Sequence, residues 1–340
     1  AYADGVNAYL DGRSGTELSL EYGVLALLNA DYVPAAWTPV NSLTWGKAMA
    51  WDLRGNMGAE IERAILLGTL SPELVEELSP PYPADHPVIV PTIGENVALT
   101  ENAHLIALET TVTRSVLSNV NTNFALLDGV LGPTGAGIGS NSWAVAGSRT
   151  TTGMPILAND PHLGIQMPSI WHQIDLRCMP VSEECPYEST GFSFPGVPGV
   201  VIGHNANIAW GFTNTGPDVM DLFIEKVNPD NPNQYEYMGE WVDFETRTEI
   251  IQVGGGDPVE LIVRSTGHGP VISNTYGPLK DEDLKEDKTA FKDKAGLDLP
   301  ENYVIALGWT ALEPGSVFEA IWGFNNVANW EEFRQAASKF

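Results

Sequence analysis

The sequence predicts an α+β protein, and three successive stretches of the chain lead to this prediction. Residues 1–80 place apolar side chains at three- and four-residue spacing, which is typical of amphipathic helices. Residues 131–140 (LGPTGAGIGS) are mostly Gly, Pro and other small residues and cannot hold regular structure. After Ser140, short apolar or alternating runs lie between turn residues, which is typical of strands. Helices, a junction and then strands indicate the α+β class.

The predicted helices follow from local signals. Helical periodicity covers the segments 16–30, 42–56 and 58–78, and Ser42 and Ser71 are placed as N-caps. The proline-rich stretch 79–91 then ends the helical region. Residues 100–130 again favour a helix, although they are rich in Thr, Ser and Asn. The last segment, NWEEFRQAASKF, predicts a helix with Asn329 as its cap.

The predicted strands fall in short runs between Gly, Pro, Asn and Asp. These runs are SWAVAG, PILAND, WHQIDL, GFSFPGVPGVVIG, NIAWGFTN, DLFIEKV, RTEIIQV and VELIVRST. The glycines 254–256, followed by Asp257, predict a hairpin turn between the last two runs.

Composition excludes several classes of function. The chain has 340 residues, 43% of them hydrophobic, which is typical of a globular protein with a sizeable core. Its formal net charge of −27 argues against nucleic acid and anionic membranes as partners. No run approaches the roughly 18 apolar residues of a membrane span, and no signal peptide is visible at the first residues. Cys178 and Cys185 are either a local disulfide or two free thiols, and a zinc site is not expected.

The glycine-rich junction GAGIGSNSWAVAG has three possible interpretations from its residues alone. A phosphate-binding loop would need a following helix and a lysine, whereas the residues after Ser140 alternate like a strand. No serine lies in a G-x-S-x-G elbow, so an α/β-hydrolase is also disfavoured. A flexible linker leading into a strand is the remaining interpretation.

Four sequence motifs that follow one another after the junction suggest a fourth interpretation, in which the junction is a processing site. From Ser140 onward, SNSWAVAG, LANDPHLG, FPGVPGVVIGHNANIAWGFTN and DVMDLF resemble the beginning of the β-subunit of the penicillin acylase family of N-terminal nucleophile hydrolases. Upstream, AYADGVNAYL and WGKAMAWDLRGNMGAEIERAIL resemble the end of its α-subunit. The resemblance implies a four-layer αββα fold, here incomplete at both ends. It further implies residues 1–95 as part of the α-subunit, 96–139 as a spacer peptide removed on maturation, and 140–340 as part of the β-subunit.

The resemblance implies a specific chemistry at the junction. Autocatalytic cleavage between Gly139 and Ser140 would give Ser140 a free α-amine, whose unperturbed pKa of about 7.7–8 suits a general base at neutral pH. One residue would then supply both nucleophile and base, because a serine hydroxyl needs an adjacent base. Gly139 lacks a Cβ, so it can adopt strained backbone angles and leave its carbonyl open to attack.

The resemblance also implies supporting residues. His162 is expected beside the nucleophile, bonded near the Ser140 amine or hydroxyl, and His204 is expected to brace the strand before the oxyanion loop. The backbone N–H of Asn214 is expected to stabilise the oxyanion. A second donor, an Asn in a motif resembling A-D-x-x-G-N-I-G-Y, and a family Arg do not occur up to Phe340. Activity of these 340 residues alone is therefore not expected.

A calcium site and an acyl pocket complete the implied site. The expected calcium ligands are Glu60, Asp218 and Asp221 with the carbonyl of Met220, in a structural role, and no organic cofactor is expected. The pocket is expected to be lined by Leu163, Ile202, Ala50 and Arg54. Leu163, Ile202 and Arg54 replace aromatic residues of penicillin G acylases, which favours an aliphatic or more polar acyl group.

The implied reaction is hydrolysis of an N-acyl amide through an acyl-enzyme on Ser140. The substrate is a β-lactam, an acyl-homoserine lactone or another acylated amine, and His162 favours the second. The resemblance further implies an α–β heterodimer from one precursor and a periplasmic or extracellular location. Two alternatives are a processed but inactive relative that acts as a binding module, and an unrelated β-rich interaction protein in which the junction is only a linker.

Overall fold

The computed structural model describes residues 1–29, 32–53, 63, 66, 70–78, 139–163, 167–273 and 302–340. The α-helices are α1 (Tyr2–Leu10), α2 (Leu20–Leu28), α3 (Pro39–Asp52), α5 (Pro72–Leu78), α8 (Val317–Phe324) and α9 (Trp330–Ala337). Short 3-10 helices cover Gly15–Glu17, Gly147–Arg149 and Thr310–Leu312. Helices before residue 79 and strands after residue 138 agree with the predicted α+β class, whereas the four-layer arrangement stays a prediction.

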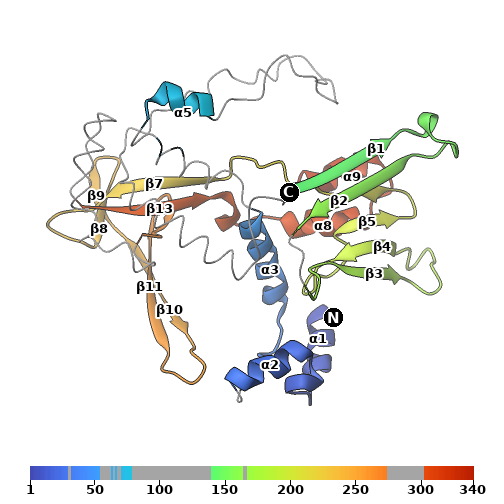
Figure 1. Ribbon diagram of the computed structural model, residues 1–340, viewed down its shortest axis with the longest axis horizontal. Coiled ribbons are helices and arrows are strands. Elements are labelled where there is room, and N and C mark those ends of the chain that lie inside the picture. The colour runs from blue at the N-terminus through green and yellow to red at the C-terminus, as the bar shows by residue number, and fades with distance from the viewer. Residues whose placement is uncertain are drawn as a thin grey trace.

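The strands pair in small antiparallel sheets. They are β1 (Gly139–Val145), β2 (Ile156–His162), β3 (His172–Arg177), β4 (Glu188–Ser193), β5 (Ile202–Asn205), β6 (Ala209–Trp210), β7 (Met220–Lys226), β8 (Gln234–Tyr237), β9 (Glu240–Asp243), β10 (Glu245–Ile251), β11 (Val259–Thr266), β12 (Gly269–Pro270) and β13 (Tyr303–Trp309). The sheet orders are β1-β2, β3-β4-β5-β6, β13-β7, β8-β9 and β10-β11-β12. Helix α3 lies between the β7–β13 group and the β1–β6 group (Figure 1).

Helix α3 begins earlier than the sequence predicted. Thr38 is its N-cap, Pro39 is its first residue, and the Thr38 N–H donates to Oδ1 of Asn41 at 2.8 Å. Ser42, the predicted cap, is instead buried inside the helix and its Oγ accepts from Nε1 of Trp37 at 3.1 Å. The prediction was wrong because a capping box with proline at the first helical position is the stronger start signal.

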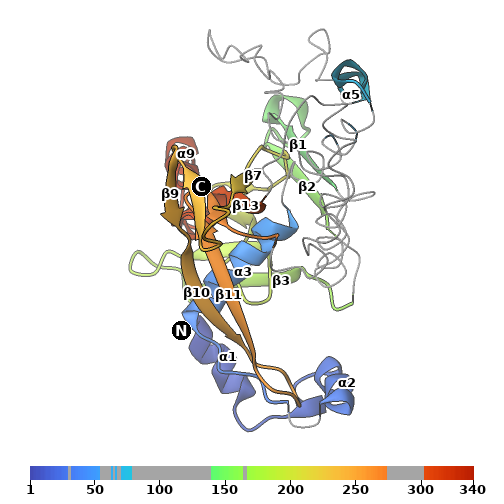
Figure 2. The same ribbon diagram turned by 90° about the vertical axis from the view of Figure 1, so that its left-hand side faces the viewer.

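Three other predicted signals agree with the structure, whereas α2 is shorter than the predicted helix 16–30 and β6 is shorter than the predicted strand 207–214. Asn329 caps α9, and its Oδ1 accepts from the N–H of Glu332 at 3.0 Å. Ser71 directly precedes α5, and its carbonyl accepts from the N–H of Val75 at 3.1 Å. The glycine turn at 254–256 joins β10 to β11 as predicted, with Gly255 at a φ of +73°. This hairpin reaches towards α2 (Figure 2).

Asn325 lies at the centre of the contact between helix α8 and the β3–β6 sheet. Its side chain is 2% exposed, and its Oδ1 accepts from the N–H of Val200 at 2.9 Å and from the hydroxyl of Tyr187 at 2.9 Å. Its Nδ2 donates to the carbonyl of Val200 at 2.8 Å, and its own carbonyl accepts from Oγ of Ser189 at 3.0 Å. Asn325 therefore satisfies polar groups from two separate stretches of the chain, residues 187–189 and Val200, through its side-chain amide and its backbone carbonyl.

Apolar packing surrounds this polar centre. The neighbouring core cluster contains Val200, Trp210, Ala320, Phe324 and Ala336. This cluster packs the loop before β5 and Trp210 of β6 against helices α8 and α9. The two C-terminal helices therefore cover the β3–β6 sheet, and residues 211–214 follow directly after its last strand.

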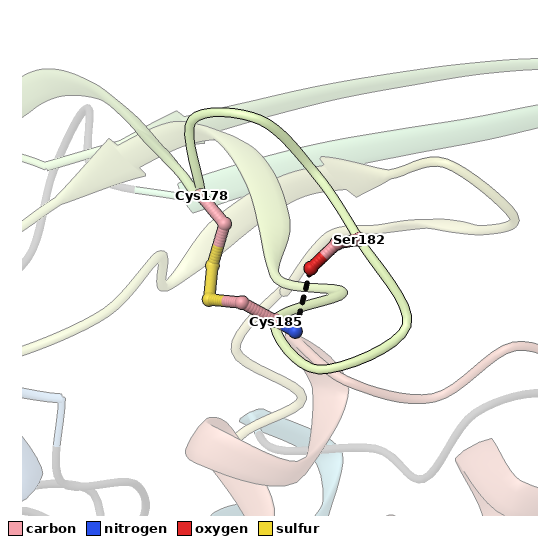
Figure 3. Close-up of a disulfide and its surroundings, with 3 residues drawn as sticks. All are labelled: Cys178, Ser182 and Cys185. Atoms are coloured by element: carbon pink, nitrogen blue, oxygen red, sulfur yellow. Dashed lines mark hydrogen bonds between the residues drawn. A yellow bond between two sulfur atoms is a disulfide. The ribbon is translucent and has the colours of Figure 1, made fainter.

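Cys178 and Cys185 form a disulfide between the end of β3 and the start of β4 (Figure 3). The N–H of Cys185 bonds to Oγ of Ser182 at 3.2 Å, and the N–H of Cys178 donates to the carbonyl of Tyr187 at 2.9 Å. Of the two alternatives left open by the sequence, the structure therefore shows the disulfide. Within the described residues, no helix has the length and apolar character needed to cross a membrane.

Candidate active site

The candidate nucleophile lies at the beginning of β1. Strand β1 pairs with β2 so that Gly139 is opposite His162 and Ser140 is opposite Pro161. A Cβ at Gly139 would meet no atom within 4 Å, and its φ lies outside the left-handed region. Gly139 does not use the backbone freedom of glycine in this structure, because it lies in extended backbone that any residue adopts. A cut at this peptide would leave Ser140 as the first residue of the strand.

One face of the β1–β2 ladder is half-buried at the end that carries Ser140. Side chains alternate between the faces, so Ser140 shares its face with its partner Pro161 and with Asn159. These three residues are half-buried, whereas the other residues of the two strands are exposed. Ser140 therefore faces the rest of the protein.

His162 lies on the opposite, exposed face. Its Nε2 is 2.8 Å from Oδ2 of Asp160, two residues earlier on the same strand, and its side chain is 43% exposed. In this arrangement the imidazole is held by Asp160, and it points away from the face that carries the Ser140 side chain. The expected hydrogen bond from His162 to Ser140 stays a prediction.

Asn159 connects β2 to the segment that precedes Asn214. Its Oδ1 accepts from the N–H of Phe212 at 3.1 Å, and its Nδ2 donates to the carbonyl of Phe212 at 2.9 Å. The same Nδ2 donates to the carbonyl of Asn141, the residue after Ser140, at 3.2 Å. Sequence reasoning did not single out Asn159. The available signal was an Asn within a predicted strand, where this residue type is depleted.

Asn214 is fixed by its side chain. Its Nδ2 donates to the carbonyl of Leu53 at the end of α3 at 2.8 Å, and its Oδ1 accepts from the N–H of Gly216 at 3.0 Å. The side-chain amide thus ties the segment to the helical part of the chain. The oxyanion role of the backbone N–H of Asn214 stays a prediction.

His204 does not brace the strand before this segment. It is exposed on β5, and its Nδ1 lies 3.3 Å from the carbonyl of Asn205. Asn205 provides the bracing instead, because its Nδ2 donates to the carbonyl of Val327 at 2.8 Å and its Oδ1 accepts from the N–H of Ile208 at 2.9 Å. The prediction for His204 was wrong, since strand alternation turns its side chain to solvent.

The predicted pocket residues lie on different elements. Ile202 is buried with Val197 and Val201, and the partly buried neighbours of this cluster are Trp45, Trp171, Phe194, Phe212, Phe318 and Ile321. Leu163 is half-buried directly after β2, and Ala50 is half-buried in α3. Arg54 lies outside the described residues. Aromatic side chains around Ile202 were not expected from the sequence and include Phe212, which Asn159 holds.

The predicted calcium ligands lie at the beginning of β7. Met220 is fully buried, and Asp221 follows it on the strand. Partial desolvation raises the pKa of Asp221, and the nearby charge of Asp218 raises it further. Glu60 lies outside the described residues. Among those residues, no cluster of three or more His, Cys, Asp or Glu could hold a metal.

Ser140 is the second residue of β1, directly after the expected cleavage point, and Asn159 links this strand to the segment that precedes Asn214. The family model described as penicillin amidase matches residues 1–340 of the chain. The chain therefore belongs to the penicillin amidase family, as its motifs predicted.

Named relatives extend this comparison. The acyl-homoserine lactone acylase QuiP of Pseudomonas aeruginosa is 30% identical over 82% of the chain and 30% of its own length. Penicillin acylase 2 proenzyme of a Pseudomonas species is 32% identical over 80% of the chain and 32% of its own length. The thermostable penicillin G acylase from Alcaligenes faecalis shows 26% identity and a TM-score of 0.44 over 58% of the chain and 31% of that protein. The chain spans about a third of the length of these relatives.

Proposed function

We propose that the chain is part of an amidohydrolase precursor with the four-layer αββα fold, which cuts itself between Gly139 and Ser140 and then hydrolyses N-acyl amides. The main support is the position of Ser140, which is the second residue of β1 and the one half-buried residue of that strand. A hydrogen-bonded link through Asn159 connects this strand to the segment that leads to Asn214. Membership of the penicillin amidase family supports the same chemistry.

The proposed reaction proceeds in two steps. The free α-amine of Ser140 takes the hydroxyl proton, and the oxygen attacks the amide carbonyl of the substrate. The backbone N–H of Asn214 stabilises the negative charge that develops on the carbonyl oxygen. The proton passes to the leaving amine as the C–N bond breaks, which leaves an ester on Ser140. Water then attacks the ester, releases the acid and restores the serine.

The proposed substrates are acylated amines of low molecular mass. The names of the relatives indicate acyl-homoserine lactones and penicillins as their substrates, and the aliphatic Leu163 and Ile202 favour a chain-like acyl group. The alternative is a processed but inactive relative that binds such molecules. Turnover separates the two, because the binding module would be cut at Ser140 yet release no amine from any acyl amide.

The test of the proposed function is the mass and N-terminal sequence of a precursor that carries this chain at the full length of its relatives. We expect a large fragment that begins Ser-Asn-Ser-Trp, because the cut would fall directly before Ser140. We also expect release of amine from a series of acyl p-nitroanilides of increasing chain length. A correctly folded precursor that remains whole would contradict the proposed function.

Calcium is proposed as a structural ion beside Asp218 and Asp221, with the carbonyl of Met220 and with Glu60. These oxygen donors fit the preference of calcium for hard ligands. Partial burial raises the pKa of Asp221 and the charge of Asp218 raises it further, and a bound cation would favour the charged form of both carboxylates.

Removal of calcium from the same precursor with EGTA is expected to lower Tm by roughly 5 °C, the size expected for an ion present at about 100 times its Kd. Asp221→Asn should abolish this response. A raised pKa in the folded state costs stability as pH rises above the usual range of Asp, so in EGTA at pH 7 the variant should be slightly more stable than the parent. Asp230→Asn is the control and should keep the calcium response, and an unchanged response in Asp221→Asn would exclude this site.

The proposed maturation divides the precursor into an α-subunit ending near residue 95, a spacer over 96–139 and a β-subunit from Ser140, which together form a heterodimer. A periplasmic or extracellular location is proposed as well. The Cys178–Cys185 disulfide supports this location, because such bonds persist in oxidising compartments.

A further inference from the structure

We propose that Asn159 is a positioning residue that sets the distance between the Ser140 strand and the backbone N–H of Asn214. This inference rests on the proposed function, since it assigns the role of one residue in that reaction. The sequence reasoning gave Asn159 no role, and the evidence for one lies in its contacts.

The contacts of Asn159 reach both parts of the candidate site. Its amide bonds the N–H and the carbonyl of Phe212, at 3.1 and 2.9 Å, so it holds that peptide unit from two sides. Its third bond, at 3.2 Å, goes to the carbonyl of Asn141, one residue after Ser140. Asn159 therefore holds β1 and the segment 212–214 in a fixed relation.

Gly211 makes this close approach feasible. A Cβ at Gly211 would lie 2.6 Å from Cγ and 2.7 Å from Oδ1 of Asn159, well inside van der Waals contact. The chain can therefore pass this close to the amide only without a side chain at position 211. Gly211 and Asn159 therefore act together, because the absence of a side chain at Gly211 leaves the space that the Asn159 amide occupies.

The expected consequence is specific to the rate of reaction. An oxyanion donor interacts with charge that develops in the transition state, so a shift in its position lowers kcat more than it changes KM. A displacement of about 1 Å can reduce a rate by about 100-fold. We expect Asn159→Leu, which removes the three bonds at similar size, to reduce kcat by about 10- to 100-fold with KM changed less than about threefold.

The experiment uses the full-length precursor and measures cleavage at Ser140, Tm, kcat and KM with acyl p-nitroanilides. Gly211→Ala displaces the same amide while leaving Asn159 unchanged, so it should lower kcat in the same way. Because both substitutions disrupt the same contact, kcat of the double variant should be no lower than kcat of the slower single variant.

Asn228→Leu is the control, because Asn228 is another half-buried amide and lies between β7 and β8, outside the candidate site. Its Oδ1 accepts from the N–H of Asp230 at 2.9 Å, and its Nδ2 donates to Oε1 of Gln234 at 3.0 Å. This variant should lower Tm with kcat unchanged.

The outcomes distinguish this inference from the proposed function. If the parent is active and kcat is unchanged in both Asn159→Leu and Gly211→Ala, the role of Asn159 is overturned but the proposed function is not. Multiplicative losses in the double variant would also overturn that role, because they would show two independent effects. A parent that neither cuts itself nor turns over any amide would overturn the proposed function, and the inference with it.

Discussion

A full-length precursor with Ser140→Ala is expected to remain uncut at the Gly139–Ser140 bond and to lose turnover of N-acyl amides. Alanine lacks the hydroxyl that attacks the Gly139 carbonyl, so neither the new N-terminus nor its free amine can form. Loss of a nucleophile that acts together with its base lowers kcat by a factor on the order of 10⁴ or more. Mass measurement of the purified protein and amine release from acyl p-nitroanilides check the two parts of this prediction.

Ser142→Ala is the matched control for Ser140. Ser142 lies two residues later on the same face of β1, and its Oγ is 3.4 Å from the carbonyl of Ala158. It is not at the expected cut, so this variant should be cleaved and active like the parent. Cleavage of the Ser140→Ala precursor at the same bond would show that another group performs the reaction.

Asn325→Leu is expected to produce the largest loss of stability among single substitutions in the described residues. The apolar side chain would leave the N–H and carbonyl of Val200 and the hydroxyl of Tyr187 without their partner. Each unsatisfied buried group costs about 1–3 kcal/mol, so the free energy of unfolding should fall by about 4 kcal/mol. Urea unfolding of the full-length protein, followed by fluorescence, measures this as a lower midpoint.

Asn326→Leu is the matched control for Asn325. Asn326 is the next residue, is exposed, and donates through Nδ2 to the carbonyl of Trp322 at 3.0 Å. Water can replace this bond in the variant, so the change in stability should be within about 0.5 kcal/mol. Equal effects at positions 325 and 326 would refute the role assigned to the buried amide.

Local patterns predicted several features that the structure contains. The apolar spacing in residues 1–80 predicted helices, and the turn at 254–256 and the cap at Asn329 follow from residue types adjacent in the chain. Local patterns were less informative at two positions, the start of α3 and Gly139. The box formed by Thr38 and Asn41 started α3 before Ser42, and extended backbone removed any conformational need for glycine at position 139.

By itself, the sequence determined that a helical part precedes a strand-rich part, the family of the chain and the strand that contains Ser140. It did not predict β8, β9, β13 or α8. Only the tertiary structure decided that Cys178 pairs with Cys185, that His162 bonds Asp160, and that Asn159 and Asn325 hold the backbone of other segments. For Asn159 and Asn325, the physical reason is the large separation of the bonded residues along the chain. Caps, turns and periodicity act between residues a few positions apart, whereas the bonds of Asn159 to Phe212 and of Asn325 to Val200 span 53 and 125 positions. A single side-chain amide bonded to distant backbone leaves no periodic trace in the sequence.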